Sequence, residues 1–161
     1  MLIRFTKGPV TAHTDLLACE RPDGTGTAAA MPKQAILPHD AFHFVVEKTL
    51  GWRDAFFAAI AAGATLADTT ARFHAVKKSP GQPPRIRQIE TLITCLQAEQ
   101  WGGGRDPAVF ITKFAAACRQ ARTPPPPLTP DDLARVRLAL REFGAAWRPL
   151  NPGQSIERPF P

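Results

Sequence analysis

Four polar side chains that could do chemistry together lie within nine residues of one another. They are His39, Asp40, His43 and Glu47. A spacing of four places the side chains of 39, 43 and 47 along one line of a helix, where they can converge on a single ion or reactant. Two imidazoles one helical turn apart, completed by a carboxylate, form a donor set that zinc uses. We therefore predict a site for zinc or another divalent metal with His39, His43 and Glu47 as ligands.

Two further carboxylates are candidates for this site. Asp40 precedes His43 by three residues, close enough to accept a hydrogen bond from the imidazole and orient it. Asp54 is a candidate from across the junction to the next helix. The pattern differs from the metalloprotease H-E-x-x-H, because the side chain of Asp40 is one methylene shorter than glutamate and reaches a different point. Peptidase activity is therefore not inferred.

The same residues also have interpretations without a metal. Asp40 near a helix N-terminus is favoured by the helix dipole. Histidines at the edge of an apolar stripe commonly hydrogen-bond the neighbouring backbone, and Glu47 with Lys48 is typical of a solvated face. Paired titratable groups beside a core also suit acid–base chemistry or ligand binding. The spacing alone leaves these alternatives open.

The His39-Asp40-x-x-His43 spacing resembles the zinc-associated H-D-x-x-H-x11-E motif of the coenzyme Q biosynthesis protein family. The resemblance covers three residues of one helix and implies zinc at the two histidines. The sequence departs from the motif at its glutamate, where Ala55 stands, with Asp54 one place earlier. The third ligand is therefore not carried over.

The adjacent histidine and aspartate are also similar to the metal-binding doublet of HD hydrolases. Those enzymes supply further histidine and aspartate ligands from other helices. The remaining histidines here are His13 and His74, and His13 precedes a predicted strand.

A wider resemblance extends over residues 1–63. An N-terminal strand pair, the segment 37–47 and a helix containing Phe56 and Phe57 resemble a family of small, uncharacterised bacterial proteins with an HDxxHxxxE helix. The resemblance implies an α+β fold and a bacterial cytosolic setting, and it implies no mechanism.

Composition sets wider limits. The chain has 161 residues, 44% of them hydrophobic, and a net charge of +6, which suits one domain with a real core and an acidic partner. Four arginines are spread around one predicted helix, and further basic residues lie elsewhere. The four are Arg135, Arg137, Arg141 and Arg148, and the others are Lys77, Lys78, Arg85 and Arg87. They predict either a solvated positive face or a non-catalytic interaction module that binds a nucleic acid or an acidic protein.

A cytoplasmic location is expected. The first seven residues lack a secretory signal, and no apolar run approaches the roughly 18 residues of a membrane span. Cys19, Cys95 and Cys118 are far apart and lack C-x-x-C spacing, so neither a disulfide framework nor a thiolate zinc site is expected.

The elements that must position these residues follow from periodicity. Alternating or extended segments at 2–7, 14–20 and 27–35 predict a three-stranded antiparallel meander. Apolar residues recur at helical spacing in five segments, for which we expect helices at 39–50, 52–62, 86–101, 107–122 and 130–148. Prolines predict a loop at 77–84.

These elements predict one α+β domain spanning 1–161. The meander occupies 1–36 and packs against the roughly five helices of residues 39–148. Residues 149–161 lack periodicity and are expected to form an extended tail, either draped over the domain or mobile.

Overall fold

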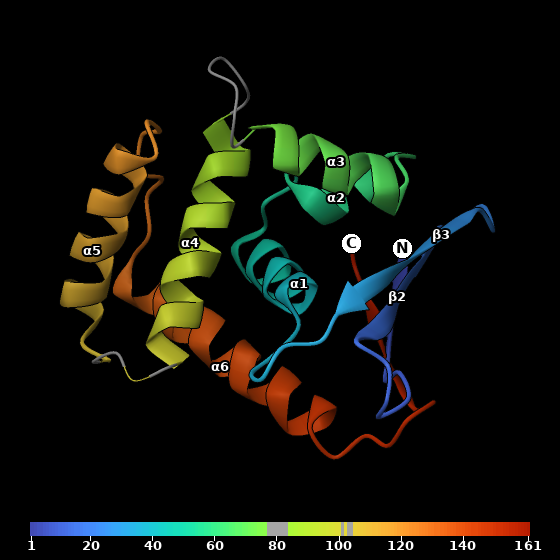
Figure 1. Cartoon of the computed structure of the whole chain (residues 1–161). Helices are drawn as coiled ribbons and strands as arrows, with labels where there is room; N and C mark the ends of the chain where they lie inside the picture. The colour runs from blue at the N-terminus through green and yellow to red at the C-terminus, as the bar shows by residue number, and fades with distance from the viewer. Residues whose placement is uncertain (77–83, 101, 103–104) are drawn as a thin grey trace.

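Both ends of the chain contribute to one antiparallel sheet in the computed structural model, which describes residues 1–76, 84–100, 102 and 105–161. The strands of these described residues are β1 (Leu2–Thr6), β2 (Thr14–Glu20), β3 (Gly26–Pro32) and β4 (Ser155–Pro159), in the order β3-β2-β1-β4 (Figure 1). The first three form the predicted meander. One face is buried, through residues such as Ile3, Phe5 and Leu17, because alternate residues of a strand point to opposite faces. The α+β prediction is confirmed.

Strand β4 lies in the C-terminal segment 149–161. The sequence predicted an extended tail there, either draped over the domain or mobile. The strand pairs with β1, and Ile156 and Phe160 are buried. The ring of Phe160 lies 6.5 Å from that of Phe44 and 5.8 Å from that of Phe57, centroid to centroid. The segment therefore extends the meander and covers part of the core.

Helices form the second layer. They are α1 (His39–Leu50), α2 (Phe56–Ala61), α3 (Leu66–Val76), α4 (Pro84–Gln100), α5 (Pro107–Gln120) and α6 (Pro130–Trp147). Five of these correspond to predicted helices, and α1 has the predicted bounds. Helix α6 starts with a capping box between Thr129 and Asp132. Helix α2 begins four residues later than predicted, at Phe56.

Helix α3 was not predicted. The segment mixes strong helix formers such as alanine with the weaker threonine and aspartate, and Thr65 and Asp68 cap its start through reciprocal hydrogen bonds. Leu66 and Phe73 are buried and anchor the helix. Of the loop predicted at 77–84, residues 77–83 lie outside the described residues, as does Trp101, the predicted end of α4.

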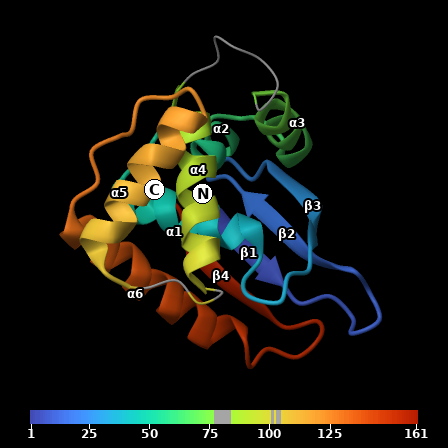
Figure 2. The ribbon, with the colours of Figure 1, turned by 60° about the vertical axis from the view of Figure 1, so that its left-hand side comes forward.

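Helix α1 is central to the molecule. It lies between the sheet and helix α4 and packs along α6 (Figures 1 and 2). Phe44 on α1 meets Phe5 of β1, with ring centroids 5.9 Å apart, and Phe5 in turn meets Phe143 of α6 at 5.1 Å. Every residue from Ala41 to Glu47 is buried. His43 and Glu47 of this helix are thereby enclosed in the interior.

None of the helices in the described parts of the chain has the length and apolar character needed to cross a membrane.

We expect Phe160→Ala to lower the free energy of unfolding by about 3–5 kcal/mol, as for other buried aromatic truncations. Glu157→Ala, which removes an exposed ion pair between β4 and Arg4 of β1, serves as the control and should change it by less than about 1 kcal/mol. Urea denaturation measures both. Equal effects of the two variants would show that the C-terminal strand does not pack on the core.

Candidate metal centre

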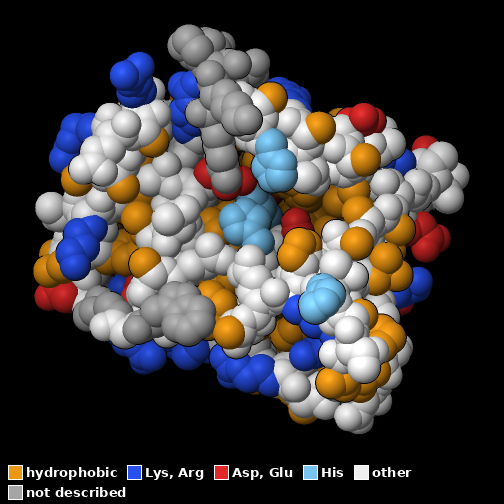
Figure 3. Space-filling view, in the orientation of Figure 1, with side chains coloured by type: hydrophobic (Ala, Val, Ile, Leu, Met, Phe, Trp, Pro, Cys, Tyr) orange, Lys and Arg blue, Asp and Glu red, His pale blue; other side chains and the backbone are white. Residues whose placement is uncertain are grey.

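His39 and His43 lie one turn apart near the start of α1, with ring centroids 4.9 Å apart. The side chain of His43 is 2% exposed and that of His39 34%. Figure 3 shows histidine side chains at a hollow in the face of the molecule seen in Figure 1, beside apolar and acidic side chains. The two imidazoles therefore stand between the core and an open cavity.

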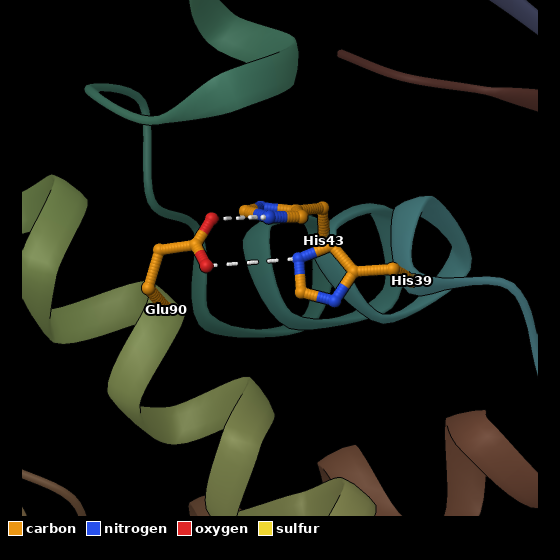
Figure 4. A group of neighbouring side chains, drawn as sticks. All are labelled: His39, His43 and Glu90. Atoms are coloured by element: carbon orange, nitrogen blue, oxygen red, sulfur yellow. Dashed lines mark hydrogen bonds and ion pairs between the residues drawn. The ribbon is translucent and has the colours of Figure 1, made fainter. Parts of the chain in front are cut away.

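Glu90 reaches both histidines from the neighbouring helix α4. Its Oε1 lies 3.2 Å from His43 Nε2, and its Oε2 lies 3.7 Å from His39 Nε2 (Figure 4). One donor atom from each of the three residues falls within 4.8 Å of the other two. Two imidazoles and one carboxylate thus converge on one point.

In this structure Glu90 hydrogen-bonds His43 and forms a looser ion pair with His39. A charge-assisted hydrogen bond between nitrogen and oxygen spans about 2.7–2.9 Å. Zinc bonds to nitrogen and oxygen of about 2.0–2.1 Å, at tetrahedral angles, set neighbouring donor atoms about 3.3 Å apart. The observed distances of 3.2 and 3.7 Å run to the two different oxygens of Glu90. The three donor atoms lie within 4.8 Å of one another and would have to move closer together to bind one ion.

Glu47, the predicted third ligand, has a different place. Its carboxylate accepts backbone N–H groups of Phe56 and Phe57 at 3.0 and 2.9 Å, and one of Ala58 at 3.4 Å. The residue before α2 is Ala55, whose side chain cannot accept a hydrogen bond. Glu47 supplies the missing N-cap from α1, where the helix dipole also favours its charge. It is 1% exposed and does not lie on a solvated face.

His43 separates the two glutamates. Its Nε2 faces Glu90, and its Nδ1 lies 3.4 Å from Glu47 Oε1. Nδ1 is buried and has no hydrogen bond in the described part of the chain. A small shift of the ring would let Nδ1–H donate to Glu47, and Nε2, which now contacts Glu90, would then be the nitrogen available to a metal. Histidine ligands are commonly held in this way by a carboxylate behind them.

Burial and charge act in opposite directions on these groups. Burial lowers the pKa of His43, but the adjacent Glu47 and Glu90 outweigh it and raise the pKa from 6.5 to about 9. Burial raises the pKa of Glu90, but His39 and His43 outweigh it and hold that pKa well below its usual range. Burial also raises the pKa of Glu47. The enclosed carboxyls therefore require positive charge beside them, from protons or from a cation.

The two other predicted acids, Asp40 and Asp54, lie in different places. Asp40 lines the same cavity as His39, His43 and Glu90, and burial raises its pKa. Asp54 is 63% exposed, and its carboxylate accepts a hydrogen bond of 2.8 Å from the guanidinium of Arg85. Asp54 is therefore tied to a surface ion pair rather than to the histidines.

The cavity in front of the histidines has a volume of about 320 Å³. It lies between β3, α1, α3 and α4. Its apolar walls are formed by Leu17, Ala29, Ala30, Pro32, Phe56, Leu66 and Phe73. The polar residues beyond the acids and histidines of the centre are Gln34, Thr70 and His74. His13, the other histidine, is not among the lining residues.

Three of the four predicted arginines of α6 gather elsewhere. Arg137, Arg141 and Arg148 line a cavity of about 280 Å³ together with Arg105. Arg137 is held in place by Glu99 at 3.0 Å. The fourth predicted arginine, Arg135, forms an ion pair with Asp132 instead.

Glu90 was not singled out from the sequence, although a signal for it exists. It follows Ile86 by four residues and precedes Ile93 by three, so it falls on the apolar stripe of a predicted helix. A carboxylate on a buried stripe needs a partner. Spacing within one helix cannot identify that partner on another.

Comparisons with known proteins give no relative: no protein-family model, curated protein or solved structure matches the chain. The function must therefore be argued from the geometry of the site.

The raised pKa of His43 predicts a pH dependence in metal-free protein. Because the folded pKa is about 9 and the ordinary value 6.5, protonation stabilises the fold fully below about pH 6.5, and this contribution is lost as the pH rises to 9. With a chelator present, urea unfolding should show stability falling across that range. His43→Gln should remove this fall of stability with pH, and His13→Ala should keep it. An equal fall in the wild type and both variants would contradict the assignment to His43.

Proposed function

We propose that the chain binds one divalent metal ion through Nε2 of His39, Nε2 of His43 and the carboxylate of Glu90. The observation that carries the proposal is the convergence of these three donors, of types that zinc binds, within 4.8 Å of one another from two helices. Zinc and iron(II) both use two histidines and one carboxylate and keep further positions open. Such a site belongs to the catalytic rather than the structural type.

Glu47 acts behind the site in this proposal. Its Oε1 lies 3.4 Å from Nδ1 of His43, from where it would orient the ring, and its carboxylate fixes the start of α2. The ion would replace the proton that His43 otherwise carries between two carboxylates. Metal binding would then release that proton, because the ligand is the neutral imidazole.

Protein purified without a histidine tag should bind one cobalt(II) or zinc ion per chain. Glu90→Gln and His39→Ala should each weaken binding by more than about 100-fold, because each removes a ligand. Glu47→Gln should weaken it by about 10–100-fold, the usual effect of losing a group that orients a ligand. The cobalt absorption spectrum and competition with a chelator measure the affinities, and circular dichroism checks folding.

His13→Ala is the matched control, since this histidine lies outside the cluster, and its affinity should equal that of the wild type. If Glu90→Gln binds normally while Glu47→Gln abolishes binding, the third ligand is Glu47, as the spacing predicts. If zinc, iron, manganese and cobalt all fail to bind, the proposal is wrong.

A second candidate function is binding of nucleic-acid phosphates at the arginine cavity. Four arginines line this cavity, which favours the candidate. Among the described residues there, Glu99 is paired with one of them, Arg137. Phosphate contacts of this kind make affinity fall steeply with salt.

Binding to a short DNA duplex should then weaken as salt rises, and Arg141→Ala should reduce the slope of log affinity against log salt by about one. Arg4→Ala removes the same charge from the outer face of the sheet and should leave the slope unchanged. Fluorescence anisotropy measures both. The second candidate is excluded by equal slopes in the two variants or by no binding at low salt.

A further inference from the structure

The cavity in front of the candidate metal has a polar end and an apolar body. His39, His43 and Glu90 all belong to its wall, so an ion bound among them would face into it. The remaining wall is mainly aliphatic and aromatic, with Leu66 and Phe73 contributed by α3. Its volume of about 320 Å³ lies at the lower end of the range for small-molecule sites.

Strand β3 makes room for this cavity. Its central residues are three alanines, which are poor strand formers, and the strand is supported by pairing with β2 along its whole length. Ala29 lies opposite Leu17 and lines the cavity with it, whereas Ala28 belongs to a depression on another part of the surface. Larger residues at Ala29 would fill the space beside the ion.

Asp40 adds an acceptor to the polar end. Its carboxyl lines the cavity beside the histidines, and within the described residues it receives no hydrogen bond from another residue. A ligand group that donates a hydrogen bond would satisfy it, whereas a second carboxylate would meet like charge. The end of the cavity therefore combines a Lewis acid with a neighbouring acceptor.

We propose that this cavity binds a small, mostly apolar carbonyl compound with an N–H or O–H beside the carbonyl, such as an amide or a hydroxamic acid. The carbonyl oxygen binds the metal, the adjacent donor bonds Asp40, and the apolar part lies against Ala29, Leu66 and Phe73. This inference rests on the proposed metal site, since the ion holds the head of the ligand.

Hydroxamic acids of two lengths test the apolar part. Acetohydroxamate and hexanohydroxamate share one metal-binding head, so the ratio of their affinities for cobalt-loaded protein reports the tail alone. Burial of four additional methylenes should favour the longer compound by at least about tenfold. Ala29→Leu should bring this ratio close to one, whereas Ala28→Leu, on the opposite face of the strand, should leave it unchanged.

The acceptor is tested by comparing hexanohydroxamate with hexanoate, which lacks the donor. Asp40→Ala should lower the preference for the hydroxamate by about tenfold, while the cobalt spectrum verifies that the metal is still bound. A length ratio near one in the wild type, or equal ratios in Ala29→Leu and Ala28→Leu, overturns the inference and leaves the metal site standing. A preference unchanged in Asp40→Ala overturns the assigned role of that carboxyl. Absence of a cobalt spectrum overturns the metal site and the inference together.

Discussion

The buried carboxylate of Glu47 is the constraint on which the centre of this structure depends. It holds the first N–H groups of α2 to the middle of α1, in place of a cap that Ala55 cannot provide. Burying this charge is costly unless it is hydrogen-bonded and paired. The backbone donors satisfy one side of it, and His43 stands at the other. One carboxylate therefore both joins α1 to α2 and faces the imidazole of His43.

The electrostatics of the interior follow from this arrangement. Glu47 and Glu90 enclose His43, so the imidazole is favoured as a cation in the absence of any ion. A divalent metal would supply the same compensation while binding Nε2 of both histidines. The cavity beyond is apolar, and a low-polarity wall strengthens electrostatic interactions at the ion. The fold thus provides compensation on one side of the histidines and access on the other.

The sequence predicted the elements whose signals are local. The 3.6-residue periodicity marked α1 within its observed bounds and put His39 and His43 on one line, and alternation marked the meander. What it missed depends on contacts between distant segments. Glu90 is 43 residues beyond the predicted Glu47, on a helix that only tertiary packing brings to α1. Glu47 accepts hydrogen bonds from the first N–H groups of α2, and the residue spacing within α1 gives no sign of this contact. The C-terminal strand is likewise fixed by pairing with β1. Helix α3 depends on a cap at Thr65 and Asp68 and on the burial of Leu66 and Phe73 against other elements.

X-ray absorption at the zinc edge of tag-free, zinc-loaded protein tests the metal site most directly. We expect about four ligands at about 2.0–2.1 Å, all nitrogen or oxygen, with the outer-shell scattering of two imidazoles. In His39→Ala this scattering should fall to that of one imidazole. Sulfur at about 2.3 Å, a single imidazole in the wild type, or a spectrum unchanged by His39→Ala would contradict it.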